Sequence, residues 1–194
     1  MNIYDITQEL FGAVVFPGDP APVRQILARM DEGSPYNLTA FSMCAHNGTH
    51  VDAPFHFIAD GKTVDQVPLD AFVGPCFVTF HTGIVTAEDA ADMLRRGGNN
   101  ARRILIGGKA TVSLEAAEVF AASDLLLIGN ESQTVGPEDG PMAVHHCLLG
   151  RGIVLLEGVR LGDVPEGTYL LSAAPINLGG ADGAPCRAVL IDLG

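Results

Sequence analysis

The residues from His46 to His56 constrain this chain more than any other stretch of its sequence. Three of the six histidines and one aspartate fall within these eleven residues, at His46, His50, Asp52 and His56. Neutral imidazole and carboxylate are ligands that hold zinc, manganese or iron in proteins. An ordinary polar loop would not gather four metal-competent side chains at a His-x3-His-x-Asp-x3-His spacing. The spacing therefore predicts a metal site.

The backbone of this segment is predicted to be extended but interrupted. Gly48 and Pro54 both disfavour a continuous helix. In a regular strand, His46 and His50 would point to one face and lie about 13 Å apart, too far to share one ion. We therefore expect the strand to break or bulge at Gly48 and to end at Pro54, which places His56 at the rim of the site.

A second group of metal-competent residues lies in the later half of the chain. The pattern over residues 141–149 predicts a helix that begins at a proline and stops at a glycine. Its adjacent histidines, His145 and His146, point about 100° apart, so only one can face a given site. The apolar run 153–156 predicts a strand that ends in Glu157. A buried unpaired carboxylate is costly, and a metal ion would provide the partner that Glu157 needs.

Length, composition and charge limit the class of protein. A chain of 194 residues with 47% hydrophobic and 18% charged residues suits one globular domain, which we expect to span residues 1–194. The net charge of −12 argues against a nucleic-acid partner, because phosphates require a basic surface. No apolar run approaches the length of a membrane span, and the N-terminus lacks the features of a signal peptide.

The four cysteines are widely spread and form no Cys-x-x-Cys motif. They are predicted to be free thiols in a reducing compartment, so we expect a cytoplasmic protein. Cys44 lies two residues before His46 and is an alternative ligand, but a small buried core residue is the favoured interpretation. His81, at the end of an expected strand, is interpreted as a strand-end or surface residue rather than as a ligand.

Hydrophobic periodicity predicts an alternation of strands and helices. Thr86 is expected to cap a helix that stops at Gly97, and Ser113 is expected to cap a helix over residues 114–121. A short amphipathic helix is expected near the N-terminus, where four apolar residues lie on one stripe, namely Val23, Ile26, Leu27 and Met30. Strands are expected over residues 2–7, 36–45, 75–81, 103–106, 125–128 and 188–191. The βαβαβ order in the middle of the chain indicates an α/β domain, a layered mixed β-sheet with flanking helices.

The stretch from His46 to Phe57 has the pattern His-x-Gly-Thr-His-x-Asp-x-Pro-x-His-Phe. This pattern resembles the signature of the metal-dependent cyclase family, which includes bacterial-type kynurenine formamidases and isatin hydrolases. The resemblance reaches the Pro-Gly-Asp segment at residues 17–19 and the closing segment 180–190, so it covers nearly the whole chain. It implies a swivelling β/β/α-like fold, and a homodimer or homotetramer with the active site near an interface.

The resemblance also implies the rest of the metal site. In the family, a histidine on the helix at residues 141–149 and a glutamate twelve residues later are ligands, and His145 and Glu157 have that separation. His146 is then interpreted as a packing residue. Many formamidases carry an Ile-Asp-Thr-x-Ser-like sequence before this histidine, whereas here Gly129 stands where the aspartate would fall. This departure affects none of the expected metal ligands, but the resemblance no longer determines the substrate.

The resulting hypothesis is metal-assisted hydrolysis of an amide-type C–N bond. The expected cofactor is zinc or manganese, as one or two ions. The ligands would be His46, His50 and Asp52 for one ion, with Asp52 bridging to a second ion held by His145 and Glu157. His56 is the candidate general base and acid, because imidazole titrates near neutral pH. The chain has no Gly-x-Ser-x-Gly motif, so a serine-hydrolase route has no support.

The resemblance favours arylformamidase activity on a small-molecule substrate, the release of formate from N-formylkynurenine. The alternative is the opening of a cyclic imide or lactam, as in isatin hydrolysis. Aromatic residues make up only 6% of the chain, and Phe16, Phe55 and Phe57 are the candidates for contact with an aryl substrate. Two hypotheses from other classes are a non-catalytic metal-dependent binding protein and a structural metal site. The latter ranks last because structural zinc sites are usually rich in cysteine.

Overall fold

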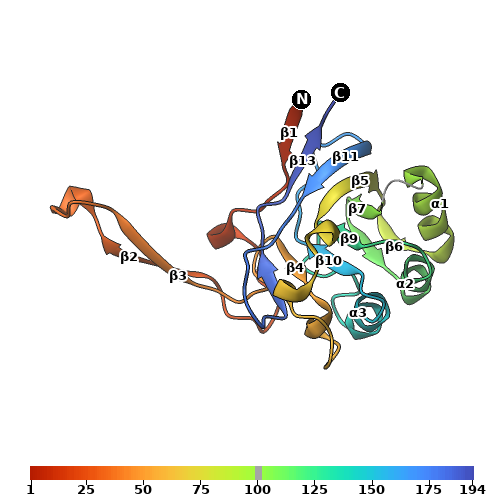
Figure 1. Ribbon diagram of the computed structural model, residues 1–194, viewed down its shortest axis with the longest axis horizontal. Helices are drawn as coiled ribbons and strands as arrows, with labels where there is room; N and C mark the ends of the chain where they lie inside the picture. Colours follow the sequence, from red (N-terminus) through yellow and green to blue (C-terminus); the bar gives the residue numbers. More distant parts are fainter. Residues whose placement is uncertain (99–101) are drawn as a thin grey trace.

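A curled mixed sheet forms the body of the protein, and α-helices gather on one side of it (Figure 1). The computed structural model describes residues 1–98 and 102–194. In these residues the sheet has nine strands, which lie in the order β1 (Asn2–Asp5), β13 (Val189–Asp192), β11 (Gly167–Ser172), β5 (Val73–Phe80), β7 (Arg103–Gly107), β9 (Leu127–Asn130), β10 (Val154–Glu157), β4 (His50–Asp52) and β12 (Gly183–Pro185). The helices are α1 (Ala87–Gly97), α2 (Leu114–Ala121) and α3 (Met142–Leu149). The predicted α/β class, with a mixed sheet and flanking helices, is confirmed.

Smaller elements complete the described part of the chain. β2 (Val23–Ala28) pairs with β3 (Leu38–Ser42), and β6 (Gly83–Val85) pairs with β8 (Ala110–Val112). The short 3-10 helices are η1 (Leu10–Gly12), η2 (Met30–Glu32), η3 (Pro54–His56), η4 (Val64–Gln66) and η5 (Leu69–Ala71). Among the described residues, the helices are all too short or too polar to span a membrane.

The centre of the main sheet is parallel, and its outer strands are antiparallel. β5, β7, β9 and β10 run parallel to one another, whereas β11 joins β5 and β4 joins β10 in the antiparallel direction. Every residue of β7 and β10 is buried, as expected for parallel strands that are covered on both faces. Leu105 packs into one apolar cluster, and its neighbours Ile104 and Ile106 pack into another. The sheet therefore has an apolar core on each face, and β4 is paired with β10 on one edge and with β12 on the other.

The helix starts predicted from capping residues are confirmed. The Thr86 hydroxyl accepts from the N–H of Asp89, and the Asp89 carboxylate accepts from the N–H of Thr86. At the start of α2, the Ser113 hydroxyl accepts from the N–H of Ala116. These caps satisfy N–H groups that have no partner inside the helix. Short-range chemistry therefore determines where both helices begin.

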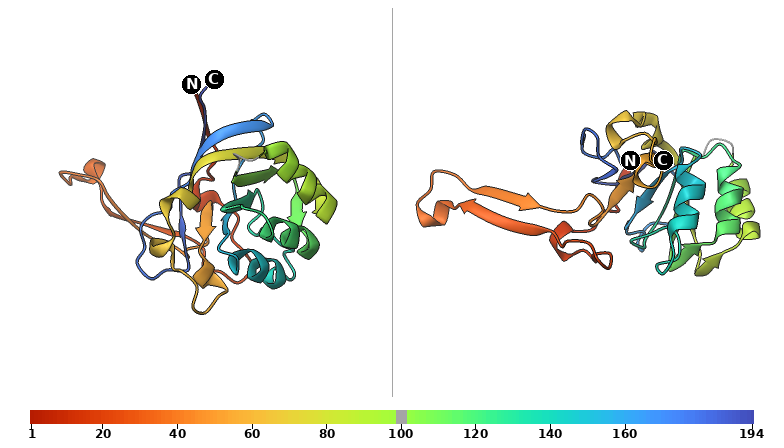
Figure 2. Two further views of the ribbon diagram at one scale, coloured as in Figure 1. Left: turned by 45° about the vertical axis from the view of Figure 1, so that its right-hand side comes forward. Right: turned by 90° about the horizontal axis from the view of Figure 1, so that it is seen from below.

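The helix predicted at residues 23–30 is wrong. This segment forms β2, which pairs with β3 in a hairpin that extends far from the main sheet (Figures 1 and 2). Its apolar side chains stay exposed, Ile26 at 53% and Leu27 at 52%, so no core contact stabilises a helical stripe. A register shift between Ile26 and Ala28 leaves Leu27 as a β-bulge. Residues 23–42 are called the arm from here on.

Gly129 lies in β9 where the backbone of β10 passes closely. A Cβ atom at this position would lie 2.3 Å from the Leu156 carbonyl oxygen and 2.9 Å from Leu105 Cδ2. No side chain fits there unless the two strands separate. Gly129→Ala is therefore expected to lower the free energy of unfolding by about 3 kcal/mol, measured by urea denaturation.

Gly162→Ala is the matched control for this prediction. A Cβ atom at Gly162 meets nothing within 4 Å, so the free energy of unfolding should change by less than about 0.5 kcal/mol. Equal stabilities of the two variants would contradict the packing argument for β9 and β10.

Candidate metal centre and active-site pocket

β4 and the 3-10 helix after it position the first group of candidate residues. Gly48 has a φ of +69°, a left-handed conformation that turns the chain between His46 and His50. The predicted interruption of the extended chain is therefore present. β4 then runs from His50 to Asp52, and η3 ends at His56. The ring centroids of His46 and His50 lie 5.1 Å apart, much closer than a straight strand would allow.

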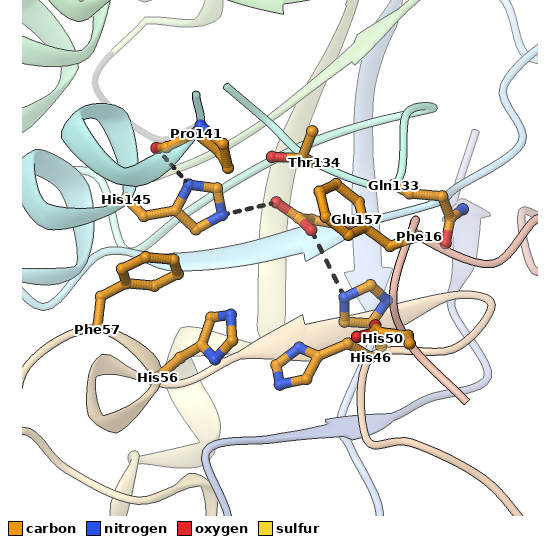
Figure 3. Close-up of a pocket in the computed structure, with 11 residues that line it drawn as sticks. Phe16, His46, His50, His56, Phe57, Gln133, Thr134, Pro141, His145 and Glu157 are labelled. Atoms are coloured by element: carbon orange, nitrogen blue, oxygen red, sulfur yellow. Dashed lines mark hydrogen bonds and ion pairs between the residues drawn. The ribbon is translucent and has the colours of Figure 1, made fainter. Parts of the chain in front are cut away.

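The second group joins the first through the sheet and α3. β4 pairs with β10 so that Glu157 lies opposite His50, and His145 reaches the same point from α3 (Figure 3). His145 Nε2 lies 3.3 Å from Glu157 Oε1 and 3.6 Å from Asp52 Oδ2. His50 Nε2 lies 3.5 Å from Asp52 Oδ1 and 3.5 Å from Glu157 Oε2. Two distant segments of sequence thus converge on the Asp52 carboxylate.

His46 and His56 lie on the other side of Asp52. His46 Nδ1 is 2.8 Å from Asp52 Oδ1, and the rings of His46 and His56 are stacked with centroids 4.0 Å apart. Among the described residues, His46, Asp52 and His56 form one group whose ligand atoms lie within 4.8 Å of one another, and His50, Asp52 and Glu157 form another. Asp52 belongs to both groups, as a bridging carboxylate would.

The hydrogen bonds around these groups fit a metal site. His50 Nδ1–H donates to the Gly48 carbonyl at 3.0 Å, and His145 Nδ1–H donates to the Pro141 carbonyl at 2.9 Å. Each ring therefore has Nε2 available as a ligand, held in place by its other nitrogen. Asp52 Oδ2 is buried and has no hydrogen-bond partner among the described residues. A divalent cation at this point would compensate that oxygen.

The pKa values show how strongly these charges interact. Burial alone would raise the pKa of Asp52, but the neighbouring His145 and His46 rings hold it well below its usual value. Burial would lower the pKa of His46, but Asp52 and Asp182 raise it to about 10. The pKa of His145 is raised to about 10 in the same way, by Asp52 and Glu157 against burial. The carboxylates of the cluster thus stabilise the protonated, positively charged imidazoles. A divalent cation would supply this positive charge in place of the protons.

Asp182 is a residue of this site that the sequence interpretation missed. Its Oδ2 lies 2.8 Å from His46 Nε2 and 3.2 Å from His56 Nδ1, so one oxygen contacts both rings. The neighbouring Gly183 begins β12 beside β4 and permits this approach, because a Cβ atom there would lie 2.7 Å from His46 Cε1. The only sequence signal was the place of Asp182 in the Asp-Gly-Ala-Pro turn of the closing segment.

A pocket of about 230 Å³ opens onto the cluster (Figure 3). Its lining residues are Phe16, Asp19, His46, His50, His56, Phe57, Gln133, Thr134, Pro141, His145 and Glu157. Two of the three predicted aromatic contacts, Phe16 and Phe57, are among them. Phe55 is not, and at 40% exposure it turns toward solvent, so the geometry gives no support to a substrate contact by Phe55. Three polar lining residues were not singled out from the sequence: Asp19, Gln133 and Thr134.

Three other residues that were considered as metal ligands lie outside the lining of the pocket. His81 Nε2 is 3.1 Å from the Ile84 carbonyl oxygen, just beyond β5. The His146 ring packs edge-on to Phe57, with centroids 5.5 Å apart. Cys44 is partly buried, and within the described residues neither it nor these two histidines belongs to a group of potential metal ligands. The positions of His81 and His146 agree with their interpretations, whereas Cys44 is not the buried core residue that was expected, because it belongs to neither apolar core cluster.

Known proteins resemble this chain along almost its whole length. The profile of the Cyclase family matches residues 4–136. A kynurenine formamidase of Erythrobacter litoralis is 34% identical over 206 residues, which cover 99% of this chain and 94% of the relative. The structure of a potential metal-dependent hydrolase with cyclase activity is 28% identical with a TM-score of 0.80, and covers 97% of this chain and 96% of its own. Isatin hydrolase A from Labrenzia aggregata shares the fold, with a TM-score of 0.84, 23% identity and coverage of 97% and 93%. The chain is therefore an enzyme of the cyclase family.

Proposed function

We propose that this enzyme is a metal-dependent amidohydrolase whose favoured substrate is N-formylkynurenine, which it converts into kynurenine and formate. The observation that carries the proposal is the convergence of His50, His145 and Glu157 on Asp52, one oxygen of which is buried and accepts no hydrogen bond from the described residues. Similarity to a kynurenine formamidase supports an aryl formamide as the substrate.

Zinc or manganese is the proposed cofactor, as one or two ions. His46, His50 and Asp52 would hold one ion, and Asp52, His145 and Glu157 would hold a second. This division differs from the two groups of ligand atoms within 4.8 Å of one another, which join His56 to His46 and Glu157 to His50. A bound ion would lower the pKa of water toward neutrality and polarise the amide carbonyl. Histidine and carboxylate ligands suit both metals, so the donor set fits either choice.

His56 is proposed to move the proton in this reaction. Burial and the neighbouring His46 together lower the pKa of His56 more than Asp52 and Asp182 raise it, which favours the neutral ring that can accept a proton. Its Nδ1–H donates to Asp182 Oδ2 at 3.2 Å, which leaves Nε2 as the accepting atom. Nε2 would take a proton from the attacking water and return it to the amine nitrogen as the C–N bond breaks. Asp182 would keep the ring in the required tautomer.

His56→Gln is expected to lower kcat by about 100-fold without loss of bound metal. Glutamine keeps a polar side chain but cannot act as a base near neutral pH. Steady-state kinetics and elemental analysis of the same preparation measure both effects. His81→Gln, which changes a histidine outside the pocket, should leave both values unchanged. Loss of metal together with kcat would instead assign His56 as a ligand.

A direct turnover assay tests the proposed substrate. Protein loaded with zinc or manganese should release formate from N-formylkynurenine more efficiently than it opens the ring of isatin. Preferential opening of isatin would favour the second candidate, a cyclic lactam hydrolase, which the fold shared with isatin hydrolase A supports. Bound metal without turnover of either compound would indicate a non-catalytic binding protein.

A homodimer is proposed as the assembled form, with the arm as its contact surface. Seven large apolar residues of the arm are exposed, each by more than 40%: Val23, Ile26, Leu27, Met30, Tyr36, Leu38 and Phe41. A two-stranded hairpin is only marginally stable alone in water, and exposed apolar side chains gathered on one hairpin favour an interface. A second copy of the chain is the proposed partner because most oligomers of single proteins are symmetric dimers.

The domain organisation and the compartment are also proposed. The main sheet contains β1 and β13, from the two ends of the sequence, which supports one domain over residues 1–194. All four cysteines are free, and two of them, Cys76 and Cys186, are buried. Free thiols of this kind are typical of a reducing compartment, so we propose the cytoplasm.

A further inference from the structure

A tight turn brings Phe16 and Asp19 to the pocket together. The Asp19 N–H donates to the Phe16 carbonyl at 3.1 Å and closes the turn. Pro17 occupies its second position and Gly18 its third, with a φ of +101° that a side chain would disfavour. The first and last residues of the turn both line the pocket. This segment therefore presents an aromatic ring and a carboxylate to whatever occupies the pocket.

The Asp19 carboxylate has no cationic partner. No lysine, arginine or histidine of the described residues lies within ion-pair distance of it, although six other aspartates make such a contact. Its one hydrogen bond from a side chain comes from the weak donor Cys44 Sγ, at 3.8 Å. The charge of Asp19 is thus available to a ligand.

Two further acceptors in the pocket lack partners. Thr134 is only 3% exposed, and its Oγ1 has no hydrogen-bond partner among the described residues. Gln133 Oε1 is also buried without a partner. Both residues follow β9 and line the pocket, and Figure 3 shows Gln133 on the side opposite His56 and Phe57. Buried oxygens without a partner are costly in a native structure, so a hydrogen-bond donor placed beside them is bound favourably.

The donor that matches this surface is a primary ammonium group. It offers three N–H donors and a positive charge, and a charge-assisted hydrogen bond to a carboxylate is stronger than a neutral one. Among the described residues, no lysine or arginine lines the pocket, and the histidines that line it belong to the candidate metal centre. We propose that Asp19, assisted by Thr134 and Gln133, binds a primary ammonium group on the amide substrate and selects for it. This inference rests on the proposed function and deepens it.

Ligand binding tests the inference without requiring turnover. The probes are kynurenine and its des-amino analogue, which keeps the ring, the ketone and the carboxylate. Isothermal titration calorimetry with the metal-loaded protein is expected to give about 10- to 100-fold tighter binding of kynurenine. In Asp19→Asn the two Kd values should agree within about twofold, because the charge is lost and the shape is kept. Thr134→Val, which keeps the side-chain shape, should reduce the preference by a few-fold.

Asp163→Asn is the matched control, because Asp163 is an exposed carboxylate outside the pocket lining, and it should keep the full preference. Equal binding of both probes to the unaltered protein, or binding of neither, would overturn the inference. Turnover of N-formylkynurenine, measured on the same samples, separates the two proposals. Hydrolysis without a binding preference would retain the proposed function alone, and a preference without hydrolysis would retain the ammonium site alone. If Asp19→Asn does not fold, Thr134→Val tests the inference in its place. An unchanged preference for kynurenine in that variant would then overturn the inference.

Discussion

Asp52→Asn is expected to lower kcat/KM for N-formylkynurenine by at least about 10⁴-fold and to remove bound metal. Among the residues that the structure describes, Asp52 is the one carboxylate that contacts three imidazoles, from His46, His50 and His145. An amide in its place keeps the volume but loses the negative charge and one of the two acceptor oxygens. Metal content by elemental analysis and steady-state kinetics on the same protein measure the effect.

Asp60→Asn is the control for this substitution, because it makes the same chemical change at an exposed carboxylate outside the site. It should retain metal and activity, and circular dichroism should show that both variants are folded. An Asp52→Asn protein that keeps its full metal content and rate would rule out the proposed centre. Loss of only half the metal would show that a second ion binds without help from Asp52.

The second large effect is expected at the arm, where Ile26→Asp combined with Phe41→Asp should convert a dimer into a monomer. Ile26 and Phe41 lie on one face of the hairpin, because Arg24 pairs with Phe41 and lies two residues before Ile26. Two charges on an apolar contact surface should raise the dimer Kd by about 10³-fold. Analytical ultracentrifugation over a range of concentrations measures this shift.

Leu69→Asp combined with Ile84→Asp is the matched control, because both residues are exposed and apolar but lie outside the arm. This variant should remain dimeric. If the unaltered protein is monomeric, or if the arm variant still forms dimers, the arm is not the contact surface. The arm lies away from the main sheet, so the monomeric variant should keep its fold (Figure 2).

Much of the fold could be predicted because its signals are local. The Thr86 and Ser113 caps depend on side chains within three residues of the backbone groups that they satisfy. Both faces of the parallel strands β7 and β10 are covered, so most residues in them are apolar. Such strands can be recognised in the sequence as apolar runs. The arm could not be predicted, because its apolar stripe fits a helix as well as a strand. Only the pairing of β2 with β3 decides between them.

The sequence by itself determined the chemistry of the site. His46, His50 and Asp52 are close in the chain, and imidazole and carboxylate groups at such spacing suit a divalent ion whatever the surrounding fold. Tertiary structure alone decided which distant residues join them. Asp182 lies 136 residues from His46 in the sequence but 2.8 Å from it in space, and Glu157 faces His50 through strand register. Register depends on hydrogen bonds and burial along whole strands, and no single residue encodes it.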